Sequence, residues 1–156
     1  MERTLVLIKP DAVERRLVGR IIARFEERGL AIVAMKLARL SEKLVRTHYA
    51  QHAGKHFYEP LVRFMAGGPT VLLVLEGKNS VAVVRDMMGK TDSSASSPGT
   101  IRGDLGLSNR FNLVHGSDSP EIAEKEIALF FKKSELVPRS PSDVGWIYDL
   151  STGEPV

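Results

Sequence analysis

Residues 4–8 read Thr-Leu-Val-Leu-Ile, and this apolar run ends at Lys9-Pro10-Asp11. Apolar side chains at successive rather than alternate positions are typical of a strand that is covered on both faces. Residues 70–76, which read Thr-Val-Leu-Leu-Val-Leu-Glu, have the same character. The two runs therefore predict two buried strands in a sheet that helices cover.

The rest of the chain alternates between helical and extended patterns. Apolar residues at helical spacing predict an amphipathic helix that Gly29 caps at its C-terminus: Leu17, Val18, Ile21, Ile22 and Phe25. Asp11 and Glu14 have the spacing of a capping box. The other expected elements are a strand over 30–40, helices over 41–51 and 59–66, a helix from Asn79 or Ser80 to Met88, a strand over 111–115 and a helix from Ser119-Pro120 to Lys133.

This order, βαβ(αα)βαβα, predicts a ferredoxin-like α/β fold, an α+β sandwich whose antiparallel sheet is covered by helices. We expect a single domain over 1–156, with a C-terminal extension over 134–156 in which Trp146 and Tyr148 need something to pack on. A long polar loop over 90–110 precedes the last strand. Such a loop is either functional or disordered, and its composition does not decide between the two.

Composition excludes several kinds of site. The absence of cysteine rules out disulfides, thiolate metal sites and a cysteine nucleophile. The net charge is +3 and both signs are interspersed, unlike a nucleic-acid-binding tail, although a small positive excess would also suit a polyanionic ligand. No apolar run reaches the roughly 18 residues of a membrane span and no signal peptide is visible, so we predict a cytoplasmic protein.

Two tempting motifs are discounted. Gly89-Lys90-Thr91 matches the end of a P-loop, but Val84 stands where the first glycine is required, and no apolar strand leads into it. His48, His52 and His56 are spaced as on one helix face, but no carboxylate accompanies them in the sequence. We interpret these histidines as a surface or groove-lining set rather than a metal site.

Glu126 is a carboxylate in an apolar stripe. At roughly 100° per residue, it lies between Ile122 and Phe130 on the last predicted helix. A buried carboxylate is costly without a partner, and His115, on the preceding strand, can supply one. A neutral imidazole can attack phosphorus through one nitrogen when an acceptor holds the other. Glu126 could be that acceptor directly or through Ser117.

Arg85 and Lys9 are two further charges in apolar surroundings. Arg85 lies beside the buried face of its predicted helix, and Lys9 ends the most apolar strand, where sheets often bind ligands. Each alone is explained by a long side chain that reaches solvent. Together with Glu126 and His115 they indicate a site, in which Gly116 is expected to remove bulk beside the histidine ring.

Residues 112–119, which read Asn-Leu-Val-His-Gly-Ser-Asp-Ser, closely resemble the N-x-x-H-G-S-D-[SA] signature of nucleoside diphosphate kinases. The signature is highly specific, and the resemblance covers nearly the whole chain. The other matching positions are 4–12, 67–69, 98–104, Glu126 and Trp146. The resemblance implies ping-pong transfer of the γ-phosphoryl group from a nucleoside triphosphate, chiefly ATP, to a nucleoside diphosphate through phosphorylated His115.

The resemblance also implies a role for each matching residue. His115 is the expected nucleophile, and Ser117 and Glu126 orient its ring. The expected nucleotide contacts are Lys9, Arg102 and Asn112 at phosphate or sugar, Tyr49 near the γ-phosphate, Arg85 and Thr91 at the β-phosphate, Phe57 stacked on the base and Leu61 beside it. The 90–110 loop would form one wall of the pocket and part of a subunit contact.

The residue chemistry agrees with these roles. Lys9, Arg85 and Arg102 offer three cations to a triphosphate, and stacking on Phe57 would accept any base. The resemblance further implies that Mg²⁺ arrives on the nucleotide phosphates, with no metal held by protein side chains. The expected partners are nucleoside di- and triphosphates and further copies of the chain, in a tetramer or a hexamer; the tail with Trp146 favours the hexamer. No membrane or specific nucleic acid is expected.

Two other functions stay open. A catalytically inactive, ferredoxin-like nucleotide-binding module would be expected to lack the histidine or its cationic partners, and none is missing here. A phosphohistidine phosphatase would favour a second acid or base near His115.

The chain departs from the family pattern at two places. Lys55-His56 stands where Arg-Pro often precedes the stacking phenylalanine, which puts a phosphate role for Lys55 in doubt. Thr91-Asp92-Ser93 replaces Thr-Asn-Pro. Without the proline the unfolded loop is freer, so we predict weaker subunit contacts or lower heat stability.

Overall fold

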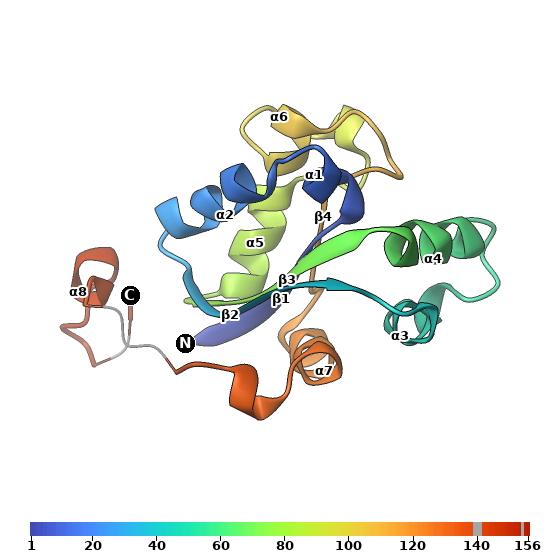
Figure 1. Ribbon diagram of the computed structural model, residues 1–156. Coiled ribbons are helices and arrows are strands. Elements are labelled where there is room, and N and C mark those ends of the chain that lie inside the picture. Colours follow the sequence, from blue (N-terminus) through green and yellow to red (C-terminus); the bar gives the residue numbers. More distant parts are fainter. Residues whose placement is uncertain (139–141, 154) are drawn as a thin grey trace.

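The computed structural model describes residues 1–138, 142–153 and 155–156, and these residues form a four-stranded sheet (Figure 1). The strands are β1 (Glu2–Ile8), β2 (Ala31–Arg39), β3 (Pro69–Gly77) and β4 (Val114–Gly116). Their order is β2-β3-β1-β4, and every neighbouring pair is antiparallel. The two apolar runs of the sequence are the two central strands, β1 and β3. The predicted ferredoxin-like α/β class is confirmed.

Helices cover both faces of the sheet (Figure 1). In the described part of the chain they are α1 (Pro10–Glu14), α2 (Val18–Glu27), α3 (Glu42–His48), α4 (Tyr58–Gly67), α5 (Ser80–Met88), α6 (Ile101–Leu105), α7 (Pro120–Phe130) and α8 (Val144–Ile147). Short 3₁₀ turns occur at Ala50–His52, Ser93–Ala95 and Lys133–Glu135. The predicted order of helices and strands is present, with α1, α6 and α8 as additions.

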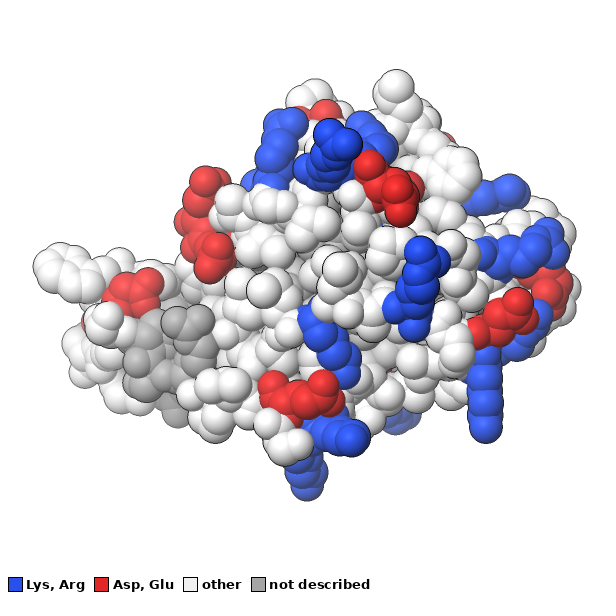
Figure 2. Space-filling view, viewed as in Figure 1, with Lys and Arg blue, Asp and Glu red and all other residues white. Residues whose placement is uncertain are grey.

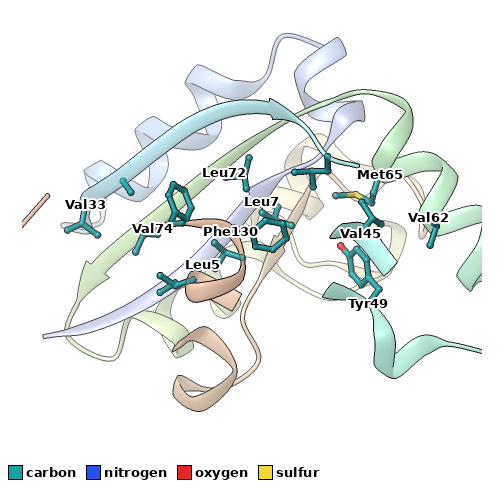
Figure 3. Close-up of a cluster of buried hydrophobic side chains, with 14 of the residues drawn as sticks. Leu5, Leu7, Val33, Val45, Tyr49, Val62, Met65, Leu72, Val74 and Phe130 are labelled. Carbon is teal, nitrogen blue, oxygen red and sulfur yellow. The ribbon is translucent and has the colours of Figure 1, made fainter. Parts of the chain in front are cut away.

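Alternate side chains of β1 enter two different cores. Leu5 and Leu7 join the cluster that includes Phe130 and residues of α3 and α4 (Figure 3). Val6 and Ile8 join the cluster on the other face, with residues of α2, α5 and α6. All four β1 side chains are completely buried. A strand that feeds a core on each face has no polar position, which is why its sequence shows no alternation.

Two predicted features near the strand ends are wrong. Asp11 and Glu14 do not form a capping box: Asp11 lies inside α1, and its Oδ2 atom accepts a hydrogen bond from the N–H of Leu113 at 3.1 Å. The last strand begins at Val114 and not at residue 111. Leu113 has a φ of 71°, which lies outside the strand region of the backbone.

Two helices end earlier than predicted, while their predicted starts are confirmed. α3 ends at His48 and α7 at Phe130, and each is followed by a separate 3₁₀ turn. Ser41 and Ser119 cap the two helices, because each side chain accepts a hydrogen bond from a backbone N–H three residues later.

The long loop over 90–110 has structure of its own. It contains the 3₁₀ turn Ser93–Ala95 and α6, whose start is capped by the side chain of Thr100. Ile101 and Leu105 of α6 are buried against α5 and β4 residues in the second core. The loop is therefore an ordered part of the fold and not a disordered insertion.

The C-terminal segment packs beside the turn between α2 and β2 (Figure 1). Gly29 has a φ of 89° as the predicted helix cap, and a Cβ there would lie 2.9 Å from Cγ2 of Ile147. The hydroxyl of Tyr148 accepts a hydrogen bond from the N–H of Lys78 at 3.1 Å. Trp146, in contrast, is 92% exposed. Of the two aromatic residues expected to pack, only Tyr148 does so within one chain.

Figure 2 shows Lys and Arg side chains mixed with Asp and Glu over the visible face, as the interspersed charges of the sequence predict. Within the described ranges, none of the helices combines the length and the apolar character that crossing a membrane requires.

Candidate active site

His115 lies on β4, opposite Leu7 of β1, and its ring reaches toward α7. Its Nε2 atom is 3.0 Å from Oε1 of Glu126. The other carboxylate oxygen, Oε2, accepts a hydrogen bond from the Ser117 hydroxyl at 2.6 Å. Ser117 Oγ accepts in turn from the N–H of Leu5 at 3.3 Å. Glu126 therefore contacts the ring directly, while Ser117 holds the carboxylate against the central strand.

Glu126 is buried, as its place in the apolar stripe predicts, with only 8% of the residue exposed. Burial raises the pKa of Glu126, but hydrogen bonds from His115 and Ser117 outweigh burial and leave the pKa below its ordinary value. An ionised carboxylate only accepts hydrogen bonds, so the Nε2 atom of His115 carries the proton. A neutral ring then has its lone pair on Nδ1, the nitrogen available for nucleophilic attack.

Lys9 and Asn112 form a buried, hydrogen-bonded pair. Lys9 is buried, and its Nζ atom donates to Oδ1 of Asn112 at 2.6 Å, while Nδ2 of Asn112 donates to the carbonyl of Thr91 at 2.9 Å. Burial, followed by the charge of Arg102, lowers the pKa of Lys9 to about 8, and Asp11 offsets part of this. The Thr91 contact is through its backbone.

Arg102 joins the long loop to β4. Its guanidinium donates to the carbonyls of Asn112, Gly89 and Val114 at 3.0, 2.8 and 2.8 Å. Burial and the charge of Arg85 lower the pKa of Arg102 to about 10. A guanidinium has five N–H donors, so donors remain for an anion. Lys9, Arg85 and Arg102 are thus close enough for each charge to affect the next.

Arg85 is not buried, contrary to the interpretation of its place on the helix. Val84 and Met88 line the buried face of α5, but the side chain of Arg85 is 45% exposed and forms an ion pair with Asp118. A long side chain can leave the face on which its Cα lies. Arg85 therefore stands at the rim of the site.

Gly116 also has a different role from the one predicted. Neighbouring residues of a strand point to opposite faces, so Gly116 faces α5 while His115 faces α7. A Cβ on Gly116 would lie 2.9 Å from Cε of Met88. The glycine permits close packing of α5 on β4 and leaves the space beside the His115 ring unchanged.

A series of aromatic rings leads away from His115. The buried Tyr49 ring lies 6.0 Å from the His115 ring, measured between centroids, and stacks on His52 at 6.1 Å. His52 contacts Phe57 at 5.3 Å. Phe57 is half-buried, and Leu61 packs against the first core. Phe57, which is expected to stack on the base, therefore lies beyond Tyr49 and His52 in this series of rings.

The two places where the chain departs from the family pattern differ in burial, since Lys55 is exposed and Ser93 is buried. Lys55 is exposed, with its Nζ 5.7 Å from the Phe57 ring centroid and 3.3 Å from Nδ1 of His52. Ser93 is buried within the loop wall at 2% exposure. Lys55 thus lies beside the ring expected to stack on the base.

His48 is a site residue that the sequence reasoning missed. Its ring lies 4.7 Å from the His115 ring and 4.3 Å from the Tyr49 ring, and its Nδ1 is 3.5 Å from Oε1 of Glu126. Burial, followed by the charge of His115, lowers the pKa of His48 to about 3, so the ring is neutral. The surface or groove interpretation is therefore wrong for His48, although His56 is exposed. Its position three residues after the buried Val45 was the available signal.

Comparison with known proteins gives a consistent result. The family model described as "Nucleoside diphosphate kinase" matches residues 2–136. The nucleoside diphosphate kinase of Carboxydothermus hydrogenoformans is 50% identical over 149 residues, which cover 96% of this chain and 100% of the relative. That of Nocardioides sp. is 60% identical over 129 residues, or 83% of this chain and 96% of the relative.

The fold points the same way. A solved structure of a halophilic nucleoside diphosphate kinase from Halobacterium salinarum, in complex with CDP, superposes with a TM-score of 0.93 at 45% identity, covering 95% of this chain and 99% of that one. The family model reaches from β1 to the 3₁₀ turn after α7 and includes every candidate site residue. The chain therefore belongs to the nucleoside diphosphate kinase family.

Proposed function

We propose that the protein transfers the γ-phosphoryl group of a nucleoside triphosphate, chiefly ATP, to a nucleoside diphosphate by a ping-pong mechanism through His115. The observation that carries the mechanism is the buried, ionised Glu126 at 3.0 Å from Nε2 of His115, which leaves the lone pair at Nδ1. In the first half-reaction Nδ1 forms a bond to the γ-phosphorus, and the bond from phosphorus to the β-γ bridging oxygen breaks. The diphosphate leaves with that electron pair, and the second half-reaction is the reverse with another diphosphate.

Charge neutralisation is the other requirement, because phosphoryl transfer depends on positioning and electrostatics. Lys9 and Arg102 supply buried positive charge, and Arg85 supplies charge at the rim. The ring keeps its Nε2 proton when Nδ1 bonds to phosphorus, and Glu126 stabilises the positive charge that develops. We propose that the substrate is the Mg²⁺ complex of the nucleotide, with the ion carried by the phosphates.

The remaining roles follow from placement. We propose that Asn112, between Lys9 and Thr91, contacts phosphate or sugar, and that Tyr49 lies near the γ-phosphate. Phe57 would stack on the base, with Leu61 at its edge. A single stacking surface explains why any base would be accepted, since stacking uses the face that all bases share. The CDP complex of the Halobacterium relative supports nucleotides as the ligands.

An inactive nucleotide-binding module is the weaker alternative. The relatives that cover nearly the whole chain are named as kinases, and each expected catalytic and cationic residue is present. A phosphatase would need a second group to deliver water to the phosphohistidine. His48 lies close enough to be considered, but its ring is enclosed by aromatic neighbours, with a side chain only 2% exposed.

Incubation with γ-labelled ATP separates the three functions. The kinase predicts an acid-labile, base-stable label on His115 that moves onto added GDP. Label that is released only as inorganic phosphate would favour the phosphatase, and absence of label would favour the binding module. Because Nδ1 is the proposed nucleophile, the phosphohistidine isomer should be the Nδ1 form. Phosphorus NMR of the denatured phosphoenzyme distinguishes it from the Nε2 isomer.

Assembly and location remain predictions. We propose a homo-oligomer, either tetramer or hexamer, and light scattering on the purified protein decides between them. The exposed Trp146 in the C-terminal extension is consistent with a surface that another subunit covers. A cytoplasmic location remains a prediction from the sequence.

A further inference from the structure

His48, His115 and Glu126 each bring one potential ligand atom to a common point, and these atoms all lie within 4.8 Å of one another. Oε1 of Glu126 is 3.0 Å from Nε2 of His115 and 3.5 Å from Nδ1 of His48. In a tetrahedral site with bonds of about 2.1 Å, neighbouring ligand atoms lie roughly 3.4 Å apart. Two of the three separations therefore already suit a tetrahedral ion.

The state of His48 is a second and independent observation. Its side chain is 2% exposed, and neither of its ring nitrogens has a hydrogen-bond partner in the described part of the chain. Buried polar groups without a partner are uncommon, because each costs desolvation free energy that nothing offsets. The proposed phosphotransfer does not use this ring. An ion that accepts the Nδ1 lone pair would supply a partner for one of these two nitrogens.

We propose that His48, His115 and Glu126 form an inhibitory site for a zinc-class divalent ion, which withdraws His115 from phosphotransfer. Two imidazoles and one carboxylate are a ligand set that zinc uses with a fourth position open to water. Mg²⁺ prefers an octahedral set of oxygens, so it would compete poorly for this nitrogen-rich site. Binding of the ion stands on geometry alone, whereas inhibition rests on the proposed function.

The inhibition follows from the position of one proton. In the free protein Nε2 of His115 carries the proton and Nδ1 has the lone pair. An ion bound at Nε2 needs the lone pair there, so the proton of a neutral ring moves to Nδ1 and no net proton is released. Nδ1 is then blocked as a nucleophile. Conversely, a phosphoryl group on Nδ1 leaves the proton on Nε2, so an ion can bind there only when that proton is released, and phosphorylation should weaken ion binding.

Titration of the wild-type protein with Co²⁺ alone, without nucleotide, tests the site. Four-coordinate Co²⁺ absorbs visible light far more strongly than six-coordinate Co²⁺, so the geometry can be read from the spectrum. We expect one equivalent of four-coordinate Co²⁺, displaced by Zn²⁺. His48→Asn should weaken binding by at least about tenfold. The matched control is His56→Asn, which removes an exposed histidine outside the cluster and should leave the affinity unchanged.

A spectrum typical of six-coordinate Co²⁺, or equal affinity in wild type and His48→Asn, would overturn the site. Should His48→Asn fail to fold, Glu126→Gln replaces it, because a neutral amide is a poor ligand and the same tenfold loss is expected. The phosphoenzyme, freed of nucleotide, should show a weaker four-coordinate band. If the four-coordinate band forms but ATP never labels His115, the proposed function fails and the metal site stands. If ATP labels His115 but no four-coordinate band forms, the metal site fails and the proposed function stands.

Discussion

The candidate site has an acid side, around Glu126, and a cationic side, around Lys9 and Arg102, and the two are built differently. On the α7 side both oxygens of Glu126 have partners, and the Ser117 hydroxyl donates to one of them while accepting from the backbone. On the cationic side Lys9 and Arg102 are both buried, and burial together with a neighbouring positive charge lowers the pKa of each. The carboxylate of Glu126 has its hydrogen-bond partners without a ligand, whereas Lys9 and Arg102 still have N–H donors to offer, so the cationic side is the incomplete one.

The difference indicates that the cationic side contributes mainly to nucleotide binding, whereas the acid side orients the nucleophile. A lowered lysine pKa means that the charged form is destabilised in the folded protein relative to water. An anion bound between the cations would relieve this destabilisation, and the free energy gained would strengthen binding. The acid side instead positions the ring in advance, so that no reorganisation is needed when phosphorus arrives. Substitutions on the two sides should therefore affect different quantities.

The largest effect is expected at the ring itself. His115→Ala removes the nucleophile and should abolish both labelling by γ-labelled ATP and turnover. The cations remain, so nucleotide affinity should stay within about tenfold of wild type, measured by equilibrium dialysis. Turnover at the wild-type rate in this variant would refute the assignment of His115.

Substitution on the cationic side should come next. Lys9→Met removes one charge that faces the phosphates, and we expect kcat/KM to fall by about 10²- to 10³-fold. The melting temperature without nucleotide should fall little, because the charge is costly in the free protein. Lys43→Met, an exposed lysine on α3, is the control and should leave both quantities unchanged. A large loss of stability with normal activity would show that Lys9 stabilises the fold and does not serve the phosphates, contrary to this prediction.

Substitution on the acid side should have a smaller effect on rate. Glu126→Gln keeps the shape and the Ser117 contact but loses the negative charge at Nε2, so labelling in a single turnover should slow by roughly 10²-fold or less. Glu124→Gln, an exposed neighbour on the same helix, is the control. A loss as complete as that of His115→Ala would mean that Glu126 does more than orient the ring.

Protonation of Lys9 gives a smaller but direct measure of the incomplete side. Its pKa is about 8 in the free protein and ordinarily 10.5. An anion stabilises the charged form and raises this pKa, so binding of ADP near pH 8 should take up part of a proton. Below about pH 7 the lysine is already protonated and uptake should vanish. Calorimetry in buffers of different ionisation enthalpy measures the uptake, which Lys9→Met should abolish.

The features that the sequence predicted correctly are those that hydrophobic periodicity or the end of a strand determines. The unbroken apolar runs of β1 and β3 placed the central strands, and the angular position of Glu126 on α7 placed it inside. Lys9 likewise directly follows β1, as the end of the apolar run predicts. In these cases the direction of the side chain follows from the local backbone alone.

The features that were missed depend on contacts between distant segments. The carboxylate beside His48 comes from α7, far along the chain, so no local spacing could reveal it. Arg85 is exposed because its side chain extends to Asp118. A helical projection shows only where each Cα lies, so it cannot predict this side-chain direction. Gly116, in contrast, could have been placed correctly, because alternation along β4 already sends it to the face opposite His115.

The smallest expected effect concerns the loop that carries Thr91 and so belongs to the incomplete side. Ser93 is the first residue of its 3₁₀ turn, where proline is tolerated, and the preceding Asp92 is extended with ψ of 111°, as a residue before proline requires. Ser93→Pro should raise stability by about 0.4–1 kcal/mol through the unfolded state, or about 1–4 °C in melting temperature. The matched control is Ser94→Pro, which loses the 3.0 Å hydrogen bond from the Ser94 N–H to Asp92 and should melt lower. If Ser93→Pro also melts below wild type, the missing proline does not explain the stability of this loop.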